Sequence, residues 1–242
     1  MQNEAVEIVN ENAHGEIVFI CEHASNRIPD DLDQLGLGDQ HLEQHIAWDI
    51  GAAAVTRNLA NHFNTSAVLA NFSRLLIDPN REEFHTGLVP QVSDGITIPG
   101  NQALGEAGVE ERKNRFYHPF HQACSEHLDG RENMKMVVAI HSFTPSMDGF
   151  DRPWPIGLLW NKDQSLAKAL LTHFEAKDIN IGDNLPYSGK DLFHTMNLHG
   201  GERGLPHVGI ELRQDQTGHE AGIGQWSQHL IEAFEEILEN HS

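Results

Sequence analysis

Short apolar segments rich in Val and Ile alternate along this chain with longer segments of helical period. This alternation is typical of a mostly parallel sheet wrapped by crossover helices, because strands buried on both faces read as continuous apolar runs. The sequence therefore predicts an α/β fold. The expected strands are Glu16–Glu22, Ser66–Phe72, Met136–Ile140, Ile156–Trp160, Ile179–Gly182 and His207–Leu212, and the expected helices are Asp39–Phe63, Gly105–Leu128, Gln164–Ala176 and Gly224–Asn240.

Two segments rich in Gly and Pro interrupt the alternation, Glu82–Gln102 and Asp183–Pro206. Loops of this length without secondary structure are usually functional or mobile, so we expect both to cover a site. For the Gly- and His-rich run His194–His207 we expect a flexible loop rather than a set of ligands. The chain has no repeat, no low-complexity tract and no obvious linker, and its 242 residues are within the range of one α/β unit. We therefore expect a single domain over residues 1–242.

The charge and composition of the chain restrict its partners. The formal net charge is −20 with only 16 Lys and Arg residues, whereas a nucleic-acid site usually needs a clustered basic surface. The apolar runs are too short to cross a bilayer, and Met1–Glu7 lacks the basic and apolar regions of an export signal. Cys21 and Cys124 form neither a disulfide framework nor a Cys-x-x-Cys site. We expect a protein of the reducing cytoplasm with no nucleic-acid or membrane partner.

Two histidines stand at the ends of expected strands. His23 follows the apolar run Ile17–Cys21, with one residue between, and His141 directly follows Met136–Ile140. In open α/β sheets, ligands bind beyond the carboxyl ends of the strands. Two histidines at such positions are less likely to occur by accident than one. Neutral imidazole is a zinc ligand, and the pair predicts a zinc site that needs a third protein ligand and an open position for water. The alternative for His23 alone is a hydrogen-bonded cap at the edge of the sheet.

The third metal ligand must be a nearby carboxylate or amide. Asp49 lies on a largely apolar stripe of the expected helix Asp39–Phe63, and a carboxylate that faces a core needs a partner such as a cation. Asn26 and Glu22 are competing ligands because they flank His23. Asp49 could instead accept hydrogen bonds from the backbone or from an arginine, as buried carboxylates often do.

Glu211 lies near the end of the expected strand His207–Leu212, on the same face as Arg213. A carboxylate in this buried place is suited to a general base that takes a proton from a metal-bound water and passes it to a leaving amine. The ordinary alternative is a structural ion pair between Glu211 and Arg213.

The segment Asn71–Arg81 follows another expected strand and carries Arg74, Asn80 and Arg81. Planar guanidinium groups bind carboxylates through two parallel hydrogen bonds, so this segment predicts a small-molecule substrate that bears a carboxylate. Alternatively, the arginines anchor the loop to Asp78 or to a surface acid.

Taken together, these motifs resemble the N-formylglutamate amidohydrolase family from about Val18 to Arg213. The most specific element is the Ser-Arg-x-x-x-Asp-x-Asn-Arg run that begins at Ser73. The family is similar in fold to the zinc carboxypeptidases. This similarity implies a three-layer α/β/α architecture with a mixed, mostly parallel sheet. Such a fold is phosphorylase/hydrolase-like, as in the zinc-dependent exopeptidases. The segments that carry the resemblance are Glu22–Pro29, Trp48–Gly51, Asn71–Arg74, Asp78–Arg81, Ile140–Phe143 and Ile210–Arg213.

The resemblance to the carboxypeptidases implies roles for three matching residues. It places a metal ligand at His141, the catalytic glutamate at Glu211 and the carboxylate-binding arginine at Arg81. The first metal loop departs from their His-x-x-Glu pattern, because Asn26 stands at the fourth position. For the third ligand, the family resemblance therefore favours Asp49.

The resemblance implies a zinc enzyme that hydrolyses the amide bond of N-formyl-L-glutamate or of another N-acyl amino acid, with Arg74 or Arg213 stabilising the oxyanion. Two other functions would use the same residues: a peptidase or cell-wall peptide amidase with the same zinc site, and a non-catalytic protein that holds an acidic metabolite. The expected site residues are His23, Asp49 and His141 for zinc, Glu211 and Arg213 for catalysis, and Arg74, Asn80, Arg81 and Ser142 for the substrate.

Overall fold

The computed structural model describes residues 4–240 and contains a central sheet of seven strands. Every strand expected from the sequence is present, with ends that differ by a few residues. β1 is not predicted by the apolar pattern, because most of its residues are half-buried or exposed. The strands of the sheet are β1 (Val6–His14), β2 (Ile17–Cys21), β3 (Thr65–Ala70), β6 (Met136–Phe143), β9 (Ile156–Leu159), β10 (Ile181–Asp183) and β11 (His207–Arg213).

The order of the strands across the sheet is β1-β3-β2-β6-β11-β9-β10. The neighbouring strands β3, β2, β6 and β11 run parallel, as do β9 and β10. β1 is antiparallel to β3, and β9 is antiparallel to β11. The sheet is therefore mixed and mostly parallel, as expected. Because β2, β6 and β11 are adjacent and parallel, their carboxyl ends meet at one edge of the sheet.

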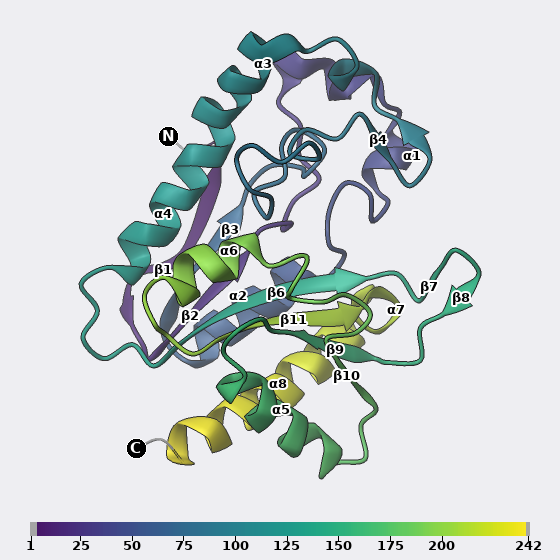
Figure 1. The fold of residues 1–242 in the computed structure, drawn as a ribbon. Coiled ribbons are helices and arrows are strands. Elements are labelled where there is room, and N and C mark those ends of the chain that lie inside the picture. The colour runs from purple at the N-terminus through teal and green to yellow at the C-terminus, as the bar shows by residue number, and fades with distance from the viewer. Residues whose placement is uncertain (1–3, 241–242) are drawn as a thin grey trace.

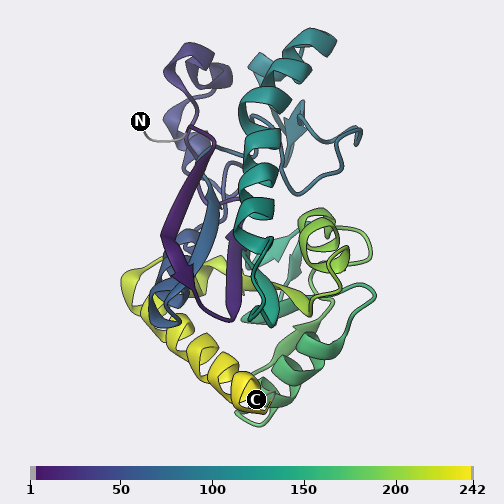
Figure 2. The same ribbon diagram turned by 90° about the vertical axis from the view of Figure 1, so that its left-hand side faces the viewer.

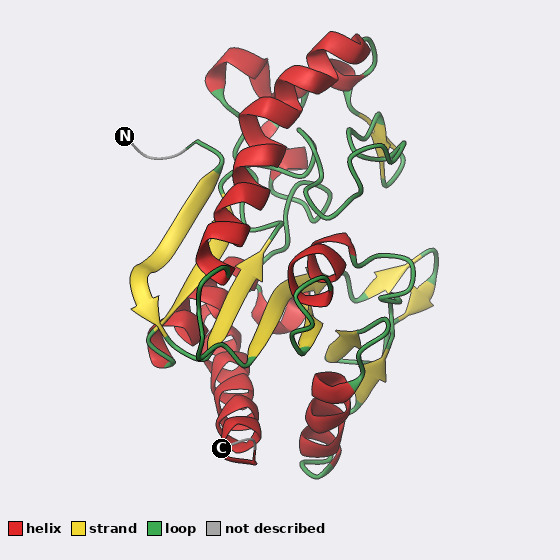
Figure 3. Ribbon diagram, turned by 60° about the vertical axis from the view of Figure 1, so that its left-hand side comes forward, coloured by secondary structure: helices red, strands yellow, loops and turns green. Residues whose placement is uncertain are grey.

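Helices cover both faces of the sheet (Figure 1). On one face, α2 (Ala52–His62), α5 (Ser165–Glu175) and α8 (Glu220–Asn240) enclose a core that includes Phe19 of β2. On the other face, α4 (His118–Leu128) and α6 (His194–Met196) enclose a second core that includes Val18 and Ile20. Figure 3 shows the strands between these two sets of helices. The expected three-layer α/β/α fold is confirmed.

The segment that precedes β3 is not one helix, so the expected helix Asp39–Phe63 is wrong. α1 spans Asp39–Leu42, α2 begins at Ala52, and turns connect them. Gly51 directly before α2 has φ +85°, a left-handed conformation that interrupts a right-handed helix. A Cβ atom at Gly51 would also collide with the carbonyl oxygen of Thr217. Asp49 therefore lies in the connection between two helices, where the Asp49 backbone N–H donates to the carbonyl of His23.

The expected helix Gly105–Leu128 is present as one continuous helical segment, which Figure 2 shows along the side of the molecule. α3 (Gly105–Arg112) continues through a π-helical turn, η3 (Lys113–Tyr117), into α4. Within residues 4–240, none of the helices combines the length and the apolar character needed to cross a membrane.

The two long segments expected to be loops contain secondary structure. The first holds the hairpin of β4 (Val92–Ser93) and β5 (Ile96–Thr97), and a short helix, η2 (Pro99–Asn101), follows it. The second holds α6 and a π-helical turn, η4 (Asn197–Gly201), so the flexible loop expected at His194–His207 is wrong there. Within this run, His199 and His207 are buried.

Candidate metal centre

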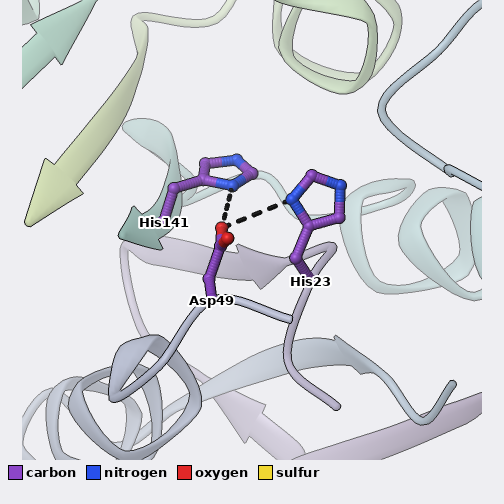
Figure 4. A group of neighbouring side chains, drawn as sticks. All are labelled: His23, Asp49 and His141. Carbon is purple, nitrogen blue, oxygen red and sulfur yellow. Dashed lines mark hydrogen bonds and ion pairs between the residues drawn. The ribbon is translucent and has the colours of Figure 1, made fainter. Parts of the chain in front are cut away.

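The local structure brings three distant side chains to one edge of the sheet. His23 follows β2, and His141 lies near the end of the adjacent parallel strand β6. Asp49 is held against His23 because its backbone N–H donates to the His23 carbonyl over 2.9 Å. Figure 4 shows the three side chains pointing toward one another. All three are buried, so the sheet edge encloses two imidazoles and a carboxylate.

The distances within this triad fit a metal ion. The three ligand atoms lie within 4.8 Å of one another. Asp49 Oδ2 is 3.3 Å from His23 Nδ1 and 2.9 Å from His141 Nδ1 (Figure 4). Donor atoms of a tetrahedral zinc ion lie about 3.3 Å from one another, because each is 2.0–2.1 Å from the metal. The two distances from Asp49 Oδ2 are therefore close to those between ligand atoms of a tetrahedral site, and the ligand atoms of the two histidines lie within 4.8 Å of each other.

A second carboxylate lies behind each histidine. His23 Nε2 is 2.8 Å from Asp78 Oδ1, and His141 Nε2 is 3.2 Å from Glu22 Oε2. Metal-ligating histidines usually donate their other ring N–H to such a carboxylate, which fixes the ring orientation. All four ring nitrogens of the pair thus face carboxylate oxygens. A neutral imidazole has only one N–H, so each neutral ring would turn its remaining lone pair toward an anion.

Two arrangements remove this repulsion. Either each ring carries one additional proton, or a divalent cation lies between the Nδ1 atoms and Asp49. Without a cation, burial opposes the charged form of His141, yet Glu22 and Asp49 hold the pKa of His141 well above its ordinary value. The pKa of His23 is also raised, because Asp78 and Asp49 outweigh the effects of burial and Arg74. A single dication carries the charge of these two protons. The donor set therefore fits a divalent metal in chemistry as well as in spacing.

Arg74 contacts the metal centre through Asp49. Its guanidinium donates to Asp49 Oδ1 and to the carbonyl of His45, which leaves Asp49 Oδ2 facing the two histidines. Burial raises the pKa of Asp49, but Arg74 and then His23 hold it well below the ordinary value. Asp49 is therefore an anion that Arg74 orients. The expected alternative, a hydrogen bond between Asp49 and an arginine, is present together with the triad rather than in its place.

The two competing ligands lie elsewhere. The Asn26 side-chain amide donates to the carbonyl of Leu42 over 2.9 Å. Glu22 is fully buried and faces the far nitrogen of His141, outside the triad. The triad therefore contains Asp49 and neither competitor.

Glu211 lies on β11 directly opposite His141 of β6 in the parallel register. Burial is the main cause that raises the pKa of Glu211 to about 7. Glu211 Oε2 is buried and has no hydrogen-bond partner among the described residues. Arg213 does not pair with Glu211: its guanidinium bonds Asp215, and its Nη1 donates to the carbonyl of Arg152. The structural Glu211–Arg213 pair is therefore absent from the described part of the chain.

The expected substrate-binding residues differ in their surroundings. Arg81 Nε is 3.6 Å from Asp78 Oδ2, and the Arg81 side chain is 32% exposed, so a ligand can reach its guanidinium. Asn80 Oδ1 accepts the backbone N–H of Thr195. Ser142 follows His141 on β6, and its hydroxyl is buried without a partner among residues 4–240.

Several residues that support the centre are not predicted by the sequence. Asp78 stands in the most specific motif, but its contact with His23 could not be read from spacing, since 55 residues separate them. Tyr117 and His121 hold the loop that carries Arg81, because the Tyr117 hydroxyl donates to the Arg81 carbonyl and His121 Nε2 to the Pro79 carbonyl. Their only signal in the sequence is the position of both on one expected helix.

Comparison with known proteins identifies the family. The model of the N-formylglutamate amidohydrolase family matches residues 15–217. The structure of a gene product from Agrobacterium tumefaciens is 38% identical, covers 98% of this chain and 96% of its own, and superposes with a TM-score of 0.94. An N-formylglutamate amidohydrolase from Ralstonia eutropha is 18% identical, with 98% of each chain covered and a TM-score of 0.73.

A metallo-carboxypeptidase from Burkholderia cenocepacia matches more distantly, with 12% identity, a TM-score of 0.42, and coverage of 98% of this chain and 61% of that one. Among curated proteins no match is found. The family model covers most of the chain and includes the triad, Glu211 and the Arg81 loop. The chain therefore belongs to the N-formylglutamate amidohydrolase family, whose name describes a hydrolase of amide bonds.

Proposed function

We propose that this protein is a zinc-dependent amidohydrolase that cleaves the amide bond of N-formyl-L-glutamate or of a related N-acyl amino acid. The observation that carries the proposal is the buried triad of His23, Asp49 and His141, with Glu211 on the strand beside it. Membership of the family supports amide hydrolysis as the reaction.

Three atoms would hold the metal: His23 Nδ1, His141 Nδ1 and Asp49 Oδ2. Two nitrogen donors and one oxygen donor are typical of catalytic zinc sites, which keep a further position open. When bound, zinc supplies Lewis acidity: it lowers the pKa of a coordinated water and polarises the substrate carbonyl. Asp78 and Glu22 would keep the histidine rings oriented.

Glu211 would move the proton that hydrolysis requires. It would accept a proton from the attacking water and deliver that proton to the leaving nitrogen. A pKa close to the working pH suits both halves of this transfer, and burial places the pKa of Glu211 at about 7. Because Oε2 has no partner within the described chain, it is available to water and then to the leaving group.

Arg81, helped by Asn80, would bind a carboxylate of the substrate, and Ser142 would contact the substrate beside His141. The partial exposure of the Arg81 side chain supports this role of Arg81. The oxyanion would be stabilised by Arg74 or Arg213, although Arg74 is bonded to Asp49 and Arg213 to Asp215. We propose a small molecule that carries a carboxylate as the partner of the site.

Two measurements on the purified protein test this function. Metal analysis should find close to one zinc ion per chain, and steady-state assays should show release of formate from N-formyl-L-glutamate. A protein that takes up no zinc at neutral pH contradicts the proposal. Turnover of short peptides without turnover of N-formyl amino acids would instead identify a peptidase, and binding without turnover would identify a metabolite-binding protein.

A further inference from the structure

Arg152 is a buried arginine whose guanidinium has unusual partners. It follows the hairpin of β7 (Ser146–Met147) and β8 (Phe150–Asp151), and it is only 5% exposed. Nη1 donates to the carbonyl and hydroxyl oxygens of Thr144 over 3.1 Å, and Nη2 donates to the sulfur of Met147 over 2.9 Å. Its other neighbours are two aromatic residues: it contacts the Tyr187 hydroxyl, and Cζ lies 4.9 Å from the ring centre of Tyr187 and 5.6 Å from that of Phe143.

None of the described carboxylates forms an ion pair with Arg152. This is notable in a chain with 36 Asp and Glu residues against 16 Lys and Arg residues, because a buried cation is normally paired. Other arginines of the structure have acidic partners; they include Arg57, Arg74, Arg81, Arg115, Arg203 and Arg213.

Arg112 shows what a purely structural buried arginine looks like in this fold. It also lacks an ion pair with a described residue, but its donors end on three oxygens, the carbonyls of Leu76 and Gly100 and the side chain of Asn101. In contrast, Arg152 Nη2 donates to a thioether sulfur, which is a weak acceptor. A carboxylate that replaced this sulfur would form a much stronger, charge-assisted hydrogen bond.

The position of Arg152 ties it to the metal centre. Phe143, which lies under the Arg152 guanidinium, is two residues beyond His141 on β6, and side chains two residues apart in a strand share a face. Tyr187, the other ring beside Arg152, lies near Glu211 and Asp49. Burial is the main cause that raises the pKa of Tyr187, and the negative charges of Glu211 and Asp49 raise it further. Arg213, two residues beyond Glu211 on β11, donates to the Arg152 carbonyl.

We propose that Arg152 determines the specificity of the site by binding a second carboxylate of the substrate, so that an N-acyl dicarboxylic amino acid is preferred over its neutral analogues. The inference rests on the proposed function. Arg81 binds one carboxylate and Arg152 the other. Met147 is 45% exposed, so its side chain can leave the guanidinium and open it to the ligand without a change in the core.

The test compares two substrates that differ in charge but hardly in shape, N-formyl-L-glutamate and N-formyl-L-glutamine. Wild-type protein should have a kcat/KM for the glutamate compound that is roughly 100-fold or more above that for the glutamine compound. In Arg152→Gln, kcat/KM for the glutamate compound should fall so far that most of this ratio is lost. The value of kcat/KM for the glutamine compound should stay within about threefold of wild type. Arg57→Gln, which removes an arginine from a surface pair with Glu7, is the matched control and should keep the ratio.

A purely structural role for Arg152 would lower activity on both substrates together and leave the ratio unchanged, which overturns the inference. The inference can also be tested on wild-type protein alone if Arg152→Gln does not fold. A wild-type ratio of the two kcat/KM values near one overturns the role of Arg152 but leaves amide hydrolysis in place. Wild-type protein that binds zinc and hydrolyses neither compound contradicts the proposed function itself, and the specificity role with it.

Discussion

Glu22 lies directly behind His141: its Oε2 is 3.2 Å from His141 Nε2, while His141 Nδ1 faces Asp49. Glu22 is fully buried, and although burial opposes its ionisation, His141 lowers the pKa of Glu22. A buried anion that touches a metal-site histidine from the far side orients the ring and increases its basicity. Glu22 therefore supports the centre, although it was a candidate for the third ligand.

Glu22→Gln should lower the affinity for zinc by about 10- to 100-fold, because the amide no longer supplies the charge that holds His141. Competition with a chromogenic chelator measures this affinity. Glu16→Gln, which removes a carboxylate from the surface pair with Lys135, is the control and should bind zinc normally. Equal affinities of wild type and Glu22→Gln would show that Glu22 has no part in the centre.

Zinc binding near neutral pH should release protons from His23 and His141. In the metal-free protein, neighbouring carboxylates raise the pKa of both His23 and His141, so protons compete with the metal for these rings. The affinity for zinc should therefore rise with pH while both rings are protonated, and fall as the pH is lowered.

Calorimetric titrations in buffers of different ionisation enthalpy measure the number of protons released. Glu22→Gln and Asp78→Asn should each reduce that number, because each removes a carboxylate that raises the pKa of one histidine. Zinc binding without proton release would contradict the charge balance of the centre.

Glu211→Gln should keep the metal and lose turnover. The amide cannot accept a proton, and removal of a general base typically costs a factor of about 100 to 10,000 in rate. Zinc content and kcat with N-formyl-L-glutamate are measured on the same preparation. Loss of zinc from this variant would instead make Glu211 a ligand, and near-normal turnover would refute its role in proton transfer.

The sequence predicts the strand ends better than it predicts their surroundings. His23 and His141 follow apolar runs that are long enough to identify as strands, so their meeting at one edge follows from the parallel order of β2 and β6. Asp49 was expected for a reason that proved wrong, since it is not on a helix. Its family motif identified it, whereas helical periodicity did not detect the break at Gly51, because one glycine is tolerated in many helices.

The contacts that surround the two histidines could not be predicted. Asp78 and Glu22 lie in motifs, but which histidine nitrogen each contacts depends on how β2, β3 and β6 pack. Arg152 and Tyr187 are 35 residues apart and lie in segments without an apolar period, so no local pattern joins them. Sequence patterns thus predicted candidate ligands at strand ends, and the structure was needed to find what contacts them.

Gly51→Ala should weaken both the fold and the metal centre. The left-handed conformation at φ +85° costs an L-residue about 1–2 kcal/mol, and the added Cβ also collides with the Thr217 carbonyl. Since Gly51 sets the chain direction between Asp49 and α2, relief of the collision should displace the Asp49 carboxylate and lower the affinity for zinc.

Gly95→Ala is the matched control for this prediction. Gly95 has φ +74° in the turn between β4 and β5, and a Cβ there meets no atom within 4 Å. This variant should pay a similar conformational cost in the free energy of unfolding and bind zinc as wild type does. Thermal unfolding and chelator competition on both variants separate the two effects. If Gly51→Ala loses stability but binds zinc as tightly as Gly95→Ala, the break before α2 does not position Asp49, and the connection between the helices tolerates the shift without moving the ligand.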